Sequence, residues 1–157
     1  MTLTIAPRVW YSWDFTIMDG PRPLAQIDQS WWREKGVLSA LGVDYRVYRE
    51  GVMSGDFILQ RGGSVLARAT KPSAFRRAFV LTYNETPYTL RAKSAFRRTF
   101  LLLDGTEQIG SIVPHGALTR RATVQLPDEW PFPVKAFAIW LTIILWKRDA
   151  DAAASSG

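Results

Sequence analysis

The amino-acid sequence predicts a mainly β domain, an antiparallel barrel of repeated hairpins closed around a buried hydrophobic C-terminal helix. Three observations carry this prediction. A short basic phrase occurs twice, apolar runs alternate with Gly or Asn turns at regular spacing, and an uncharged apolar run lies near the C-terminus. Many short strands at regular spacing are typical of a sandwich or a barrel. A helix that is apolar on all sides needs to be surrounded by protein, which favours the barrel.

The repeated phrase is the strongest of these observations. Ser73–Phe79 returns as Ser94–Phe100, 21 residues later, with six of seven residues identical. An apolar run and a turn follow each copy. Such self-similarity indicates a structural unit that was built more than once. The unit is short, β-like and very basic.

The predicted hairpins share one template, in which an apolar strand, a Gly or Asn turn and a strand with small residues follow each other. The first runs through Trp13–Gly20, where apolar and polar residues alternate up to an Asp-Gly turn, and returns along Leu24–Ile27. Asp-Gly and Gly-Gly supply the positive φ that tight hairpin turns need. The three later hairpins are Gly55–Ala67, Phe79–Arg91 and Phe100–Val113.

Between the first and second hairpins, Val43–Arg49 alternates as a half-buried strand. Val43, Tyr45 and Val47 fall on one face of that strand, because successive side chains point to opposite sides. The preceding Trp31–Lys35 is a polar-aromatic segment with no clear period.

The C-terminal segment breaks the β pattern. Pro127–Pro133 ends the sheet, and Ala136–Trp146 then contains no charge and one polar residue, Thr142. A helix of this length spans about 16 Å, roughly half of a bilayer core, so we expect it inside the protein and not across a membrane. We predict a helix over Val134–Arg148, with a buried strand as the alternative.

Length and composition fit one domain. The chain has 157 residues, 47% of them hydrophobic, and we expect a single domain over 1–149 with a flexible tail over 150–157. It has no Cys, which excludes disulfides and thiolate metal sites. Met1–Pro7 lacks the features of a signal peptide. We therefore expect a cytoplasmic protein, either free or peripheral to a membrane.

Positive charge is concentrated in one part of the chain. The whole chain has a net charge of +6, whereas Phe57–Leu103 contains nine basic residues and one acidic residue, a net charge of +8. A basic segment within a nearly neutral protein suggests an anionic partner, such as a lipid headgroup, a nucleic acid or an acidic protein. The alternative is a solvated sheet face rich in Arg.

Several segments of the chain together carry a family resemblance. They are Phe15–Gly20, the two Ser-Ala-Phe-Arg-Arg phrases, Leu102–Gly105, Ile109–Ile112 and Phe137–Trp146. In this order they resemble the superfamily that joins tubby C-terminal domains, phospholipid scramblases and LURP-one-related proteins. The resemblance implies a barrel of about twelve strands around a central hydrophobic helix, and binding of phosphoinositide headgroups through surface Lys and Arg, as in tubby proteins. The chain is shorter than tubby proteins, and it shows no scramblase-like cysteine-rich or proline-rich segment and no adjacent membrane span.

The sequence contains no motif for catalysis or metal binding. The single histidine, His115, lies in a Pro-His-Gly turn, and no nucleophile-elbow motif accompanies it. Asp19 and Asp104 precede Gly in hairpin turns and lack the other oxygen ligands of a calcium loop. The bulky residues of the predicted helix leave little internal cavity. We expect no catalytic residues, no metal and no buried cofactor.

The Arg-Arg pairs are the best candidates for a site. An unpaired guanidinium buried in the barrel would cost several kcal/mol. We therefore place the pairs at strand starts near the rim, with Phe75 and Phe96 anchored inward. Guanidinium groups match phosphate geometry, although carboxylates such as Glu50, Asp56 or Asp128 are alternative partners. The predicted anion- and lipid-binding residues are Lys71, Arg76, Arg77, Lys93, Arg97, Arg98, Arg120 and Arg121.

These observations predict a non-catalytic binding module that recognises anionic lipid headgroups or another polyanion through an Arg-rich barrel rim. A scaffold for protein interactions without a lipid role is the main alternative. Nucleic-acid binding and an enzyme activity are less favoured, because no recognised nucleic-acid motif or catalytic constellation is present.

Overall fold

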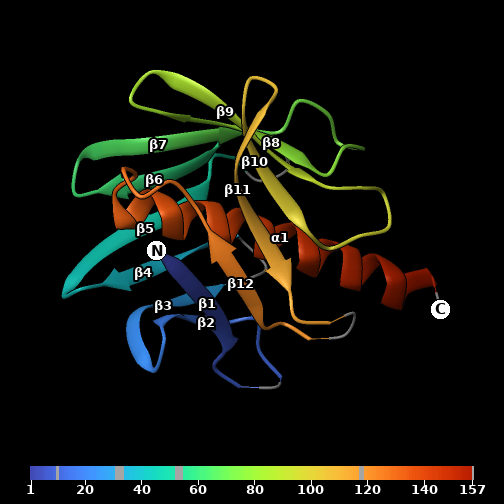
Figure 1. The fold of residues 1–157 in the computed structure, drawn as a ribbon, viewed down its shortest axis with the longest axis horizontal. Helices are drawn as coiled ribbons and strands as arrows, with labels where there is room; N and C mark the ends of the chain where they lie inside the picture. The colour runs from blue at the N-terminus through green and yellow to red at the C-terminus, as the bar shows by residue number, and fades with distance from the viewer. Residues whose placement is uncertain (10, 31–33, 52–54, 117–118, 157) are drawn as a thin grey trace.

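The computed structural model describes residues 1–157 except 10, 31–33, 52–54, 117–118 and 157. Twelve antiparallel strands form one closed barrel, and a C-terminal helix runs through it (Figure 1). Each strand from β2 to β11 pairs with the strands before and after it in the chain. The strands are β1 (Thr2–Pro7), β2 (Phe15–Asp19), β3 (Arg22–Ser30), β4 (Lys35–Ala40), β5 (Val43–Arg49), β6 (Phe57–Arg61), β7 (Ser64–Thr70), β8 (Ala78–Tyr83), β9 (Thr86–Ala92), β10 (Phe100–Asp104), β11 (Glu107–Pro114) and β12 (Ala122–Gln125).

The first and last strands close the barrel. In β1, Thr4 lies opposite Thr123 of β12 on one side and opposite Met18 of β2 on the other. Closure removes the unpaired strand edges that an open sheet would expose. The sequence analysis did not single out β1, β4 or β12, and Trp31–Arg33 of its polar-aromatic segment lies outside the described residues. The predicted fold class, a closed antiparallel barrel of hairpins around a buried helix, is confirmed.

The meander places its connections alternately at two ends of the barrel. One end, here called the turn end, carries the short hairpin turns. The other, the loop end, carries the longer connections on which the Arg pairs lie. Because β12 runs from the loop end to the turn end, the helix that follows it enters at the turn end. The helix then emerges at the loop end (Figure 1).

Two kinds of hairpin alternate around the turn end. The β4–β5 and β8–β9 turns have two consecutive residues with positive φ, and in β8–β9 these are Asn84 at 51° and Glu85 at 66°. The β2–β3, β6–β7 and β10–β11 hairpins instead combine one positive-φ glycine with a register shift in the strands, as at Gly105 and Leu102/Leu103. The Asp-Gly and Gly-Gly turns therefore lie where the sequence predicts them.

The helix α1 (Phe132–Ser156) forms the centre of the core. Its residues from Val134 to Trp146 are all buried. In the core, the ring of Phe57 packs edge-on against Phe79 and Trp140, with ring centroids 5.2 and 5.8 Å apart. The strand side chains that point inward thus meet the helix on all sides, which accounts for the absence of a polar face in this segment.

The predicted end of the helix at Arg148 needs correction, because the helix runs on into the segment that was predicted as a tail. The helix continues to Ser156, with exposed side chains from Asp149 onward. Alanine is the best helix former, and this part of the chain is rich in it. Lys147 and Asp151 also form an ion pair of 2.5 Å one turn apart. An already nucleated helix is extended at little cost by such residues.

Candidate anion-binding surface at the loop end

Several connections at the loop end are closed by the same backbone hydrogen bond. In four of them, the first backbone N–H donates to a carbonyl six positions later: Arg8 to Asp14, Glu50 to Asp56, Lys93 to Thr99 and His115 to Arg121, at 2.8 to 3.0 Å. The connection between β7 and β8 occupies the corresponding place around the barrel. Repeated loops with a shared frame present their side chains at corresponding positions.

All three Arg pairs lie in these loops, and the two members of each pair have different surroundings. Arg77, Arg98 and Arg120 are half-buried, whereas Arg76, Arg97 and Arg121 are exposed. Each pair ends within one residue of the start of a strand. In extended chain, neighbouring side chains point in opposite directions, so one arginine of a pair points toward the protein and the other away from it. The expectation that the pairs lie near the rim, at strand starts, is confirmed.

The half-buried arginines connect each loop to the next one around the barrel. Arg77 Nη1 donates to the carbonyl oxygens of Ser94 and Arg97 at 3.2 and 2.8 Å. Arg98 Nη1 donates to the carbonyl of Thr119 at 2.6 Å. Arg120 continues the series by donating to the carbonyl of Ser12 in the loop between β1 and β2. These three guanidinium groups therefore hold the loops together.

Each of the half-buried guanidinium groups also lies over an aromatic ring. The distances from the guanidinium carbon to the ring centroid are 5.6 Å for Arg77 over Phe100, 4.7 Å for Arg98 over Trp146 and 5.3 Å for Arg120 over Trp13. Cation–π contacts of this kind stabilise a partly desolvated arginine. Burial lowers the pKa of Arg98, and the nearby charge of Arg77 lowers it further.

Lys71 belongs with these loop-holding residues. Its Nζ donates to the carbonyl of Arg76 at 2.5 Å and lies 5.6 Å from the centre of the Phe79 ring. Burial lowers the pKa of Lys71, with a second contribution from the positive charge of Arg148. Of the predicted anion-binding residues, Lys71, Arg77, Arg98 and Arg120 are therefore engaged inside the protein.

The prediction that Phe75 and Phe96 anchor inward is wrong. These side chains are 96% and 97% exposed, whereas Phe79 and Phe100, four residues later in each copy, are fully buried. The backbone N–H of Phe75 donates to Ser73 Oγ at 3.1 Å, which turns the loop before the strand begins. The inward anchor of each repeat is thus its second phenylalanine, the one that belongs to a strand.

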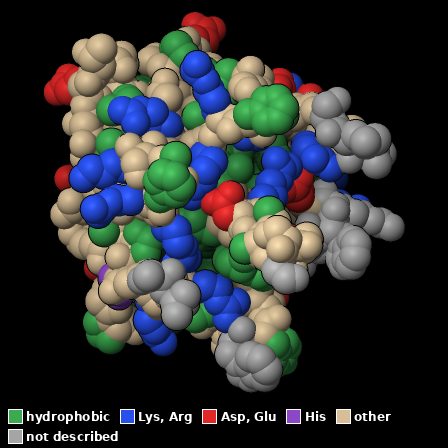
Figure 2. Space-filling model, turned by 90° about the vertical axis from the view of Figure 1, so that its right-hand side faces the viewer, with side chains coloured by type: hydrophobic (Ala, Val, Ile, Leu, Met, Phe, Trp, Pro, Cys, Tyr) green, Lys and Arg blue, Asp and Glu red, His purple; other side chains and the backbone are tan. Residues whose placement is uncertain are grey.

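Two corresponding grooves lie beside the exposed phenylalanines. The first has a volume of about 480 Å³, and its lining includes Phe75, Arg76, Arg91 and Lys93. The second, of about 290 Å³, is lined by Phe96, Arg97, Arg98, Thr99, Pro114 and Gly116. None of the described residues that line either groove is acidic. Figure 2 shows Lys and Arg side chains gathered over the face at which the helix ends, with hydrophobic side chains among them.

A third hollow at this end, of about 320 Å³, has a mixed lining that includes Arg49, Asp56 and Arg148. Glu34 beside it is buried and accepts hydrogen bonds from Arg148 Nε and Nη2 at 2.8 and 2.6 Å. Arg49 also pairs with Glu34 at 3.0 Å. Two arginines therefore share one buried carboxylate in this corner, and Lys71 also lines the hollow.

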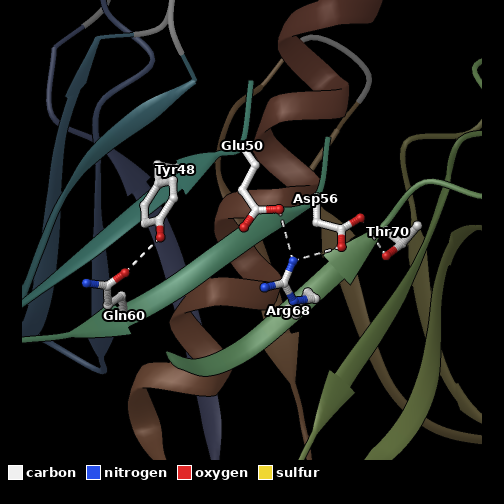
Figure 3. Close-up of polar contacts among 6 residues, drawn as sticks. All are labelled: Tyr48, Glu50, Asp56, Gln60, Arg68 and Thr70. Carbon is white, nitrogen blue, oxygen red and sulfur yellow. Dashed lines mark hydrogen bonds and ion pairs between the residues drawn. The ribbon is translucent and has the colours of Figure 1, made fainter. Parts of the chain in front are cut away.

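The carboxylates considered as partners of the Arg pairs contact other groups. Glu50 and Asp56 both pair with Arg68 of β7, at 3.0 and 2.9 Å, and Thr70 Oγ1 donates to Asp56 (Figure 3). These two hydrogen bonds raise the pKa of Arg68. Asp128 lies at the turn end and pairs with the N-terminal amine of Met1 at 2.7 Å, an interaction that lowers the pKa of Asp128.

Arg77 does have a carboxylate partner. Arg77 Nη2 lies 2.7 Å from Asp149 of α1, so the helix end contributes to the loop-holding network. The side chains of Arg76, Lys93, Arg97 and Arg121 have no ion pair or hydrogen bond with any described residue. We call these four the exposed cations of the loop end.

Within the described residues, no helix is both long enough and apolar enough to cross a membrane. Comparison of the chain with family models, curated proteins and solved structures gave no match.

Proposed function

We propose that this protein is a non-catalytic module that binds anionic lipid headgroups at a membrane surface through the exposed cations of the loop end. The observation that carries the proposal is the division within the Arg pairs. One arginine of each pair hydrogen-bonds to a neighbouring loop. The other is exposed and has no carboxylate partner among the described residues. Exposed guanidinium groups on a fixed base suit phosphate oxygens, which accept two parallel hydrogen bonds.

The arrangement of these cations supports a flat, extended anionic partner. Corresponding loops bring Arg76, Arg97 and Arg121 to the same end of the barrel at successive positions around its rim. The grooves beside Arg76 and Arg97 contain no acidic lining residue among those described. We also propose that the protein is related to the tubby and scramblase superfamily, which its sequence resembles. Binding of lipid headgroups is what that resemblance implies.

A vesicle sedimentation assay tests the proposal. We expect the protein to sediment with vesicles of phosphatidylcholine and phosphatidylserine, and not with phosphatidylcholine alone. Because a basic residue near an anionic membrane contributes about 1 kcal/mol, the double variant Arg76→Gln/Arg97→Gln should lose affinity by roughly thirtyfold. Binding should also weaken steeply with salt, since exposed charges are screened over about 8 Å at physiological ionic strength.

The matched control removes the same charge from the turn end. Arg22 and Arg61 are exposed there and have no ion pair with a described residue, so Arg22→Gln/Arg61→Gln should bind nearly as the wild type does. Equal losses in both double variants would show that net charge alone governs binding, against the proposed site. Failure to bind anionic vesicles, with retention of DNA or RNA on a filter, would replace the lipid proposal with a nucleic-acid one. Failure with both partners would favour a protein-interaction scaffold.

A further inference from the structure

The two phenylalanines of the repeated phrase are the most exposed large hydrophobic side chains in the described part of the chain. Phe75 is 96% and Phe96 97% exposed, against 74% for Tyr11, the next in order. Single exposed hydrophobic residues are common on protein surfaces. Two almost fully exposed aromatic residues at the same position of neighbouring repeated loops, each followed by an exposed arginine, form a pattern that folding by itself does not require.

The loops that carry these phenylalanines are held by side-chain hydrogen bonds to their backbone carbonyls. Arg77 donates to the carbonyls of Ser94 and Arg97, which flank Phe96 on either side in the chain. Lys71 donates to the carbonyl of Arg76, directly after Phe75. Rings on a fixed base can enter a partner without first ordering the loop, which avoids part of the entropic cost of binding.

The surroundings of the rings indicate which partner would receive them. Phe75 lines the first groove together with Arg76 and Lys93, and Phe96 lines the second together with Arg97. Aromatic side chains beside Lys and Arg are typical of the boundary between lipid headgroups and acyl chains, where the ring is buried and the cation meets phosphate. A lipid bilayer offers negative charge and an apolar layer at adjacent depths, which matches this combination.

We propose that Phe75 and Phe96 insert side by side into the bilayer, while the cations of their grooves bind the headgroups above. This inference rests on the proposed lipid function and adds to it a mode and an orientation of binding. The side of the loop end formed by the β7–β8 and β9–β10 connections faces the membrane, and the turn end with the N-terminus faces away from it. Because burying a Phe side chain contributes about 1.5–3 kcal/mol, each ring should strengthen binding about tenfold or more.

The absence of Cys from the chain allows a direct test of insertion. Phe75→Cys and Phe96→Cys are each labelled with the polarity-sensitive fluorophore NBD, and Thr106→Cys, exposed in a turn at the opposite end, is the control. With phosphatidylcholine–phosphatidylserine vesicles, we expect a blue shift of NBD emission at positions 75 and 96, and quenching by spin labels on the acyl chains. Position 106 should show neither effect.

Affinity measurements separate this inference from the proposed function. Phe75→Ser/Phe96→Ser should bind the same vesicles about a hundredfold more weakly with an unchanged dependence on salt, and Phe75→Leu/Phe96→Leu should retain most binding. Val65→Ser, which removes an exposed apolar side chain near the turn end, should have no effect. Wild-type sedimentation without a spectral shift, and with no loss in the serine variant, would overturn insertion and leave the electrostatic proposal standing. Absence of any sedimentation would overturn both.

Discussion

At the residue scale, adjacent arginines of the same pair have different physical roles. Arg98 is half-buried, donates to the carbonyl of Thr119 and lies over the ring of Trp146. Arg97 is exposed and has no ion pair or hydrogen bond from its side chain to a described residue. The same contrast separates Arg77 from Arg76. In each copy of the repeat, one arginine therefore holds the neighbouring loop and the other is exposed to solvent.

This contrast predicts unequal effects on stability. Arg98→Gln removes a charged donor from a partly buried carbonyl and a cation from the Trp146 ring, so it should lower the free energy of unfolding by about 1–3 kcal/mol. Arg97→Gln should change it by less than about 0.5 kcal/mol, as is usual for an exposed position. Urea denaturation followed by tryptophan fluorescence measures both values. Equal values for the two variants would contradict the assignment of Arg98 to the frame.

At the scale of elements, the helix α1 combines a buried segment with an exposed one. Its residues from Val134 to Trp146 are surrounded by the barrel, while Asp149 to Ser156 extend beyond the loop end. The buried part is held by tertiary packing, as is usual for helices in water, and the exposed part is extended by alanine propensity. The stability of the domain should therefore depend on the first segment and hardly on Ala150 to Ser156, whereas Asp149 still pairs with Arg77.

A charge placed in each segment tests this difference. Ile143 is 3% exposed, and Ile143→Asp should unfold the domain because an unpaired buried carboxylate costs several kcal/mol. Ala150→Asp, in the exposed part of the same helix, should melt within a few degrees of the wild type. Circular dichroism on heating distinguishes the two outcomes, and a folded Ile143→Asp variant with near-normal melting would argue against the central position of α1.

At the scale of the whole molecule, the closed meander explains why a repeat in the chain becomes one surface in space. Every second connection of an antiparallel meander returns to the same end, so loops with similar sequences become neighbours there. Closure through β1 and β12 also brings the loop of Arg120 beside the loop that contains Ser12. The two ends of the barrel consequently differ, with the exposed cations of the loop end on one side and short turns on the other.

Closure itself can be tested at β1. Thr4 is paired with strands on both sides, so Thr4→Pro should disrupt the closing ladder and cost about 3 kcal/mol or more. Thr4→Val keeps the backbone donor and the β-branched shape, and it should remain close to the wild type. We expect the proline variant to melt at a much lower temperature. A wild-type melting curve would show that the barrel does not depend on this pairing.

The sequence by itself determined four of the hairpins with their turns, and the buried helix, whereas the β4–β5 hairpin was not predicted. Local chemistry decides these features, because Asp-Gly and Gly-Gly adopt the φ values of tight turns and because Ala136–Trp146 has no polar face to expose. The basic segment and its repeated phrase were also evident in the sequence. They led to the prediction of the exposed cations of the loop end among the candidate anion-binding residues. Their placement near the rim followed from the cost of burying an unpaired guanidinium.

Only the tertiary structure decided how these residues are used. Whether Phe75 or Phe79 points inward depends on where β8 begins, and Ala78 is its first residue. Which arginine of a pair is exposed depends on carbonyls in the next loop, such as that of Thr119, which lies 21 positions away from Arg98 in the chain. The strands β1 and β12 were not evident because their pairing joins opposite ends of the chain. Contacts between distant segments arise from closure of the barrel, and no local pattern records them.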